Sequence, residues 1–144
     1  YTHLRVMNLA YRHRVAGWLS LGLFATLGMV LEALLAFKTP SYIGAIGELR
    51  RNLWTLAHAH GTLISLIHLA FAAHISERRS PKLSLASPAL FVALVVMPAG
   101  FLLGGAFPSE SDPGIGIWLV PLGGLSLVGA CILLAIDATQ RHGD

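Results

Sequence analysis

Four long apolar blocks constrain this chain more than any other feature of its sequence. They cover residues 15–37, 52–75, 85–107 and 115–136, and charged or proline-containing segments separate them. A helix needs roughly 20 apolar residues to cross about 30 Å of hydrocarbon. Because each block reaches that length, the sequence predicts an all-α integral membrane protein. We expect a four-helix bundle of transmembrane helices that forms a single membrane domain over residues 1–144.

The composition agrees with a membrane protein. Of the 144 residues, 55% are hydrophobic and only 12% are charged, whereas a soluble domain averages roughly 25% charged residues. The basic residues lie beside the apolar blocks and form no stripe interleaved with exposed aromatics, so the formal net charge of +3 does not predict a nucleic-acid partner. The expected partners are the lipid bilayer and other membrane subunits, or further copies of this chain.

The distribution of basic residues predicts an orientation in the membrane. Residues 1–14 carry three arginines among apolar residues, and we expect them to form a basic amphipathic segment at the membrane interface. The loop at residues 77–82 is also basic, whereas the loop at residues 108–114 is acidic. Because positively charged loops are retained in the cytoplasm, both termini are predicted to be cytoplasmic. The expected location is a bacterial inner membrane.

Ionisable side chains inside the apolar blocks are the first candidates for a functional site, because such groups are costly in hydrocarbon. Glu32 lies near the outer end of the first block, and His58 and His60 follow the outer start of the second. At about 1.5 Å per residue, all three lie roughly 9–12 Å below the outer surface. We therefore expect a polar layer at this depth, with His68 deeper, near the middle of the bilayer.

Small residues in the third and fourth blocks lie opposite this layer. Such residues let membrane helices approach closely. Six positions are therefore predicted to be helix-packing residues: Gly100, Gly104, Gly105, Pro121, Gly123 and Gly124. Two interpretations of the layer stay open. It is either a polar pocket walled by glycine or a buried pair of Glu32 with one histidine that only fixes the helix register.

Other ionisable residues are expected outside the layer. His13 and His74 are predicted at the cytoplasmic edge, either as solvated histidines or as a pair that holds a haem or a lipid headgroup. His68 is expected to donate a hydrogen bond to a backbone carbonyl or to a serine. Asp137 and Arg141, four residues apart on a helix, are expected to form an exposed ion pair.

The alanine-histidine-alanine-histidine stretch at 57–60 resembles the haem-binding helix of haem-copper oxidases and nitric oxide reductases. In those enzymes the two histidines face opposite ways and bind different haems. The resemblance implies haem b as a cofactor, with His58 and His60 as candidate ligands. Glu32 and His68 are further candidate haem or metal ligands because they are ionisable groups inside the apolar blocks. Residues two apart on a helix point about 200° apart, so His58 and His60 cannot chelate one ion. A transition-metal site would need waters or a neighbouring subunit to complete it.

The whole layout also resembles the small four-helix membrane proteins of the YgdD type. The matching stretches are His-Gly-Thr-Leu at 60–63, Leu-Gly-Gly-Ala-Phe at 103–107 and Val-Pro-Leu-Gly-Gly at 120–124. The chain departs from that pattern in its doubled histidine, in Glu32 and in its longer basic N-terminus. The resemblance implies a four-helix membrane fold and no particular chemistry.

Three functions stay open at the level of the sequence. The leading prediction is a non-catalytic accessory or structural subunit of a larger membrane complex, with a redox assembly as one candidate. The short loops, the glycine-rich helices and the lack of a complete catalytic motif favour it over an enzyme. The first alternative is a haem- or metal-binding protein that uses Glu32 with His58 or His60. The second is a small transporter or proton relay through Glu32, His60 and His68.

Overall fold

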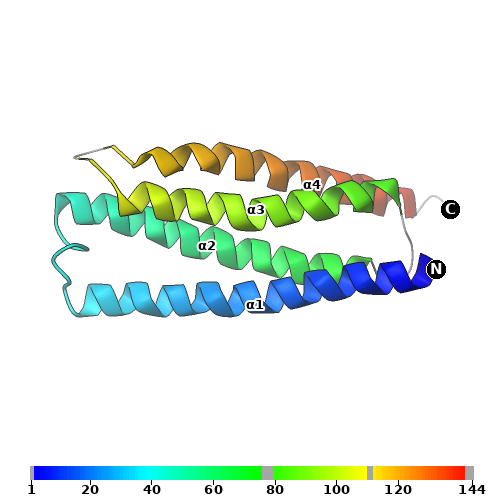
Figure 1. Cartoon of the computed structure of the whole chain (residues 1–144), viewed down its shortest axis with the longest axis horizontal. Coiled ribbons are helices and arrows are strands. Elements are labelled where there is room, and N and C mark those ends of the chain that lie inside the picture. Colours follow the sequence, from blue (N-terminus) through cyan, green and yellow to red (C-terminus); the bar gives the residue numbers. More distant parts are fainter. Residues whose placement is uncertain (1, 76–79, 110–111, 142–144) are drawn as a thin grey trace.

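The computed structural model describes residues 2–75, 80–109 and 112–141. In this part of the chain, four long helices run side by side (Figure 1). They are α1 (Thr2–Ala36), α2 (Ala45–His74), α3 (Pro81–Ala106) and α4 (Leu119–Arg141), the last preceded by the short 3-10 helix η1 (Ile115–Trp118). All four long helices contain a segment long and apolar enough to cross a membrane. The predicted all-α membrane bundle is confirmed.

The helices extend beyond the apolar blocks from which they were predicted. α1 begins at Thr2, so the basic N-terminal residues form the first turns of the same continuous helix. α2 begins at Ala45, well before the predicted start at residue 52. α3 begins at Pro81 and continues without a break through its two internal prolines. The apolar blocks therefore locate the helices but do not give the residues at which they begin.

Arg50 makes polar contacts close to the start of α2. Its guanidinium group donates hydrogen bonds to the carbonyl oxygens of Ser41 (2.6 Å), Gly105 (2.9 Å) and Ala106 (3.4 Å). The last carbonyls of a helix have no partner within the helix and carry partial negative charge, so a cation is favourable there. Arg50 thus joins the first turns of α2 to the end of α3.

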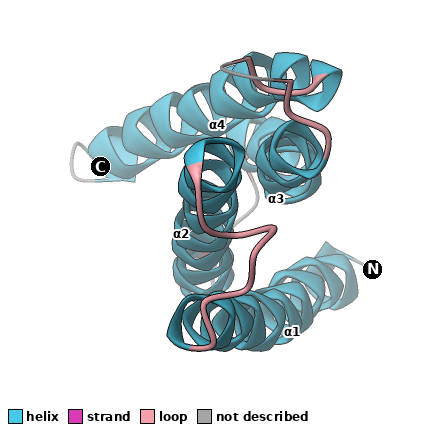
Figure 2. Ribbon diagram, turned by 90° about the vertical axis from the view of Figure 1, so that its left-hand side faces the viewer, coloured by secondary structure: helices cyan, strands magenta, loops and turns pink. Residues whose placement is uncertain are grey.

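The helices pack in chain order, with α1 against α2, α2 against α3, and α3 against α4. Figure 2 shows α2 and α3 lying between α1 and α4. Both termini lie at the same end of the bundle (Figure 1). We call this end, which holds Ile75, Pro81 and Gln140, the inner end. The opposite end, which holds Tyr42 and Arg50, is the outer end.

The two flanking helices are much less covered than the two central ones. In the most apolar part of α1 and of α4, 11% of residues are buried, against 39% in α2 and α3. The core side chains follow the contact between α2 and α3. From the inner to the outer end they include Phe71, Leu90, Ile64, Ala93, Leu53 and Phe101. The outer faces of α1 and α4 are therefore left for lipid or for a partner to cover.

Glycines allow α3 and α4 to approach at backbone distance. A Cβ atom added to Gly123 would lie 2.6–2.8 Å from the Cβ, N and Cα atoms of Met97. A Cβ atom added to Gly100 would lie 2.9 Å from a side-chain methyl of Val120 and 3.0 Å from its backbone nitrogen. Real Cβ atoms are essentially never this close to other heavy atoms, so both positions require glycine or a shift of the helices.

The other predicted packing positions differ from one another. A Cβ atom on Gly105 would lie 2.7 Å from the ring of Trp54, at the contact of α2 with α3. At Gly104 and Gly124 the nearest atoms would lie 3.5 Å away, which is an ordinary van der Waals distance. Pro121 is exposed. Close approach of the helices therefore depends on Gly100, Gly105 and Gly123 much more than on Gly104, Gly124 or Pro121.

Candidate functional site

Two fully buried histidines meet where α1, α2 and α3 come together. His13 Nδ1 lies 2.9 Å from His68 Nδ1, and His13 Nε2 lies 2.8 Å from Ser87 Oγ. Both histidines are 0% exposed, and Ser87 is 6% exposed. The rings of Phe71 and Phe91 lie 4.4–4.8 Å from the imidazole rings, measured between centroids. Buried ionisable groups in a membrane bundle are rare and usually functional, so this cluster is the main candidate site.

The sequence of α1 brings His13 to this position. Ala10, His13, Gly17, Ser20 and Phe24 follow one another at steps of three or four residues, which places them on one face of a helix. Four of these five residues are buried, and Ser20 is half-buried. This face packs against α2, so the helical period directs the His13 side chain into the bundle.

The contact between the two histidines requires them to be different tautomers when both are neutral. One Nδ1 atom donates a hydrogen bond and the other accepts it. If His13 donates through Nδ1, its Nε2 accepts from the Ser87 hydroxyl, and His68 carries its proton on Nε2. If His68 donates through Nδ1, His13 donates through Nε2 to Ser87 Oγ instead. The two arrangements differ only in where the protons lie along one chain of three side chains.

A polar stripe continues from His68 along α2 toward the outer end. Its members are His58, Thr62, Ser65 and His68, whose spacing of three to four residues puts them on one face of the helix. The Ser65 hydroxyl lies 2.6 Å from that of Ser20 on α1. Thr62 Oγ1 is buried and has no hydrogen-bond partner among the described residues. His68 Nε2 is also buried without a well-formed hydrogen bond, and the His68 ring interacts with the backbone of Leu90 on α3. From His58 to His68 the stripe spans about 15 Å, roughly half of the hydrocarbon thickness.

The structure does not bring the predicted outer layer together as one site. His58 faces α1, where its Nδ1–H donates to the carbonyl oxygen of Phe24 at 2.7 Å. His60 donates to a carbonyl of its own helix at 2.8 Å and stacks on Phe101 of α3, with 5.0 Å between ring centroids. Glu32 is exposed on α1. No hydrogen bond or ion pair between described residues joins Glu32 to either histidine.

The opposite directions of His58 and His60 agree with the 200° separation expected on a helix. Each donates its Nδ1–H to a backbone carbonyl, which leaves Nε2 with a lone pair, as in many metal-bound histidines. Over residues 2–75, 80–109 and 112–141, however, no group of three or more histidine, cysteine, aspartate or glutamate side chains could hold a metal ion. The described residues therefore offer donors but no assembled haem or metal site.

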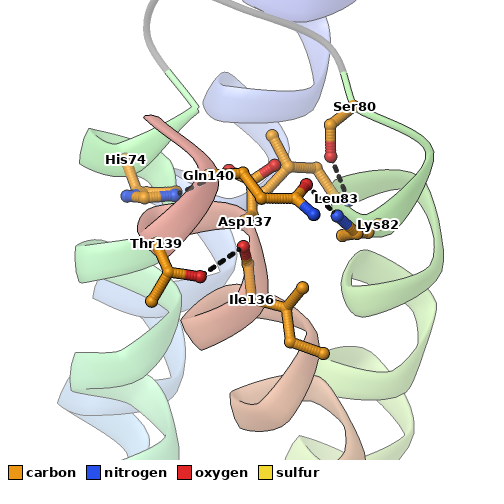
Figure 3. Close-up of polar contacts among 8 residues, drawn as sticks. All are labelled: His74, Ser80, Lys82, Leu83, Ile136, Asp137, Thr139 and Gln140. Carbon is orange, nitrogen blue, oxygen red and sulfur yellow. Dashed lines mark hydrogen bonds and ion pairs between the residues drawn. The ribbon is translucent and has the colours of Figure 1, made fainter. Parts of the chain in front are cut away.

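A second polar contact lies at the inner end, between α2 and α4. His74 Nε2 lies 3.2 Å from Asp137 Oδ2 (Figure 3). Asp137 is 6% exposed, so the expectation that its carboxylate is exposed is wrong. It lies between the inner ends of α2 and α4, where Lys82 of α3 also donates a hydrogen bond to the Gln140 side chain (Figure 3). The side chain of Arg141, its expected partner, is outside the part of the chain that the structure describes.

His13 is the site residue that the sequence prediction misplaced. A solvated position at the membrane edge is wrong, because α1 is already within the bundle at this residue and His13 is fully buried. Its partner is His68 and not His74. The burial of His13 could have been predicted from the small and polar residues that share its helix face, which are Ala10, Gly17 and Ser20.

No family model, curated protein or solved structure matches this chain. The function is therefore inferred from the residues themselves.

Proposed function

We propose that this protein relays protons within a membrane through the pair of His13 and His68. The observation that carries the proposal is the direct 2.9 Å contact between their Nδ1 atoms, with both rings fully buried among membrane-length helices. Histidine suits this role because it can bind or release a proton on either ring nitrogen. A pair of such rings can pass a proton without a lasting charge in the hydrocarbon.

One transfer step conserves protons and charge. A proton arrives at Ser87 Oγ, and Ser87 gives its own proton to His13 Nε2. His13 then releases its Nδ1 proton to His68 Nδ1, and His68 releases a proton from Nε2. One proton enters and one leaves, and the pair has changed from the first tautomeric arrangement to the second. The return to the first arrangement requires reorientation of the rings or transfer in the opposite direction.

The polar stripe on α2 supplies the continuation of this path toward the outer end. Ser65 and Ser20 already form a hydrogen-bonded pair. Thr62 Oγ1 is a position at which a bridging water could bind, because buried polar groups without protein partners commonly bind water. The proposed path therefore leads from Ser87 through the histidine pair toward His58.

Proton flux into sealed proteoliposomes tests the relay. The purified protein is reconstituted with a potassium gradient, and internal pH is followed with a trapped dye after valinomycin is added. We expect His68→Asn and His13→Asn each to lower the flux about tenfold or more, since positioned proton-transfer groups contribute at least that much. The matched control is His60→Asn, on the same helix but facing α3, which should keep its flux. Equal flux in all four proteins, or no flux above empty liposomes, would contradict the relay.

Histidine ¹⁵N spectra give a readout that does not depend on transport. In the wild-type protein at neutral pH, one buried histidine should be an Nδ1–H tautomer and its neighbour an Nε2–H tautomer, or both should exchange between the two. Two static rings with identical tautomers would contradict the hydrogen bond. This measurement also identifies a variant that loses flux because it does not fold.

A second function, that of an accessory subunit of a larger membrane complex, is supported by a different observation. Among the described helices, α2 is the only one that packs closely along α1, and α1 carries Glu32 on an exposed face. A carboxylate directed at lipid is costly, so a neighbouring protein helix with a polar group is a favourable cover for it. The partner is another membrane subunit or a second copy of the chain, and a relay subunit of a redox complex combines both functions.

Purification from native membranes in a mild detergent tests the accessory function. The protein should migrate as a stoichiometric complex, and Glu32→Gln should weaken that complex. Glu48→Gln, on the exposed outer part of α2, is the control and should leave the complex intact. Recovery of a lipid-solvated monomer only would contradict this function.

We also propose that the inner end faces the cytoplasm of a bacterial inner membrane, because residues 1–14 and the segment at residues 77–82, which leads from α2 into α3 at this end, are both basic. Reporter fusions to the C-terminus test this orientation. A fluorescent protein that folds in the cytoplasm should be bright, whereas alkaline phosphatase activity at the same position would place this end outside.

A further inference from the structure

An open groove of about 530 Å³ lies between α1 and α3, in the inner half of the bundle. Its volume is in the range of sites that hold small ligands. α1 contributes Arg12 to the lining, and α3 contributes Ser84, Ser87, Phe91 and Val92. Ser87 is the serine that contacts His13, so the groove lies directly beside the histidine pair.

The groove changes in character with depth. Counted from Pro81 at about 1.5 Å per residue, Ser84 lies roughly 5 Å inside the inner end and Val92 roughly 16 Å inside it. The shallow end therefore offers a hydroxyl group, and the deep end offers the apolar surface of Phe91 and Val92. This order matches an amphiphile that lies parallel to the helices, with its headgroup toward the inner end.

Arg12 gives the groove a positive charge that the described protein does not neutralise. Its side chain is exposed, and its guanidinium carbon lies 5.6 Å from the centre of the Phe91 ring. No carboxylate in the described part of the chain forms an ion pair with it. A cation within a membrane-spanning segment favours a counter-anion, and a guanidinium group binds a phosphate through two parallel hydrogen bonds. The long side chain of Arg12 can also extend along the groove toward Ser84.

We propose that this groove binds an acidic phospholipid. The lipid phosphate accepts hydrogen bonds from the Arg12 guanidinium and the Ser84 hydroxyl, and one acyl chain lies along Phe91 and Val92. Charge selects an acidic lipid over a zwitterionic one, and the apolar deep end selects a lipid over free phosphate. The lipid phosphate contacts do not depend on the proton relay, because neither Arg12 nor Ser84 is a member of the relay, although Ser87 lines the same groove.

Thermal unfolding of the full chain in detergent micelles tests the proposal, with phosphatidylglycerol, phosphatidylcholine of the same acyl chains, or inorganic phosphate as the probe. Phosphatidylglycerol should raise the Tm at concentrations about tenfold lower than phosphatidylcholine. Arg12→Gln should remove most of that preference, and Arg12→Lys should keep part of it because the charge remains. The control is Arg14→Gln, which is exposed but does not line the groove, and should keep the full preference.

Three results would overturn the proposal. Equal shifts with the two lipids would show that the groove does not select charge. An equal loss of preference in the Arg12→Gln and Arg14→Gln proteins would show only a general attraction to basic residues. A saturable shift with inorganic phosphate as large as that with phosphatidylglycerol would identify a site for free phosphate, without a role for the acyl chain.

Discussion

The contact between α1 and α2 and the contact between α3 and α4 both use glycine, but the glycines have different neighbours. On α4, Gly123 lies against backbone atoms of Met97. On α1, Gly28 lies against the imidazole ring of His58, and on α2, Gly61 lies against the ring of Phe24. The glycine of the α3–α4 contact therefore allows two backbones to approach, while the glycines of the α1–α2 contact provide space for side chains.

The two contacts also differ in polarity. Between α1 and α2 lie the His13–His68 pair and the Ser20–Ser65 pair. In the α3–α4 contact, Gly100 packs against Val120 and Gly123 against Met97, while Lys82 and Gln140 form a hydrogen bond at the inner end. Backbone contacts cannot adjust without a shift of a whole helix, whereas side chains can rotate. We therefore infer that α3 and α4 form a fixed support and that the proposed relay lies along the surface between α1 and α2, with Ser87 of α3 at its start.

The largest loss of stability is expected where an added side chain would meet backbone atoms. Gly123→Ala would place a Cβ atom 2.7 Å from the Met97 nitrogen, so α4 must move away from α3. Overpacking of this kind costs about 2 kcal/mol of the free energy of unfolding. Gly129→Ala, on the same helix but with open space around it, is the control and should be neutral or slightly stabilising. Unfolding in a detergent titration measures both, and equal stability of the two variants would show that the α3–α4 contact is adjustable.

A smaller loss of stability is expected when the histidine pair is substituted. Hydrogen bonds between membrane helices contribute about 0.6 kcal/mol to the free energy of unfolding on average, and up to about 1.7 kcal/mol. His68→Leu leaves His13 with a buried nitrogen that has lost its partner, and we expect a loss of about 1.5 kcal/mol. His13→Leu together with His68→Leu should cost about 1 kcal/mol less than the sum of the two single changes. The same unfolding titration gives these values, and strict additivity would mean that the two rings do not interact.

The fold could be predicted from the sequence because bilayer thickness sets the length of a spanning helix, and this chain has four blocks of that length. The directions of His58 and His60 also followed from helical geometry, since positions two apart point away from each other. Depth alone, however, cannot show which face of α1 carries Glu32. The burial of His13 likewise depends on how α1 packs against α2 and α3, and the length of the apolar block gave no indication of that packing.

The smallest loss of stability is expected for a substitution at Gly28, because the neighbouring His58 side chain can be displaced without movement of a helix. Gly28→Ala would place a Cβ atom 2.6 Å from His58 Cε1, so His58 must rotate and weaken its hydrogen bond to the Phe24 carbonyl. A ring can move more cheaply than a backbone, and we expect a loss below about 1 kcal/mol. Gly22→Ala on the same helix, with no atom within 4 Å of the added Cβ, is the control and should not destabilise the protein. If Gly28→Ala costs as much as Gly123→Ala, the α1–α2 contact is as rigid as the α3–α4 contact. The distinction between a fixed support and an adjustable polar surface would then have to be abandoned.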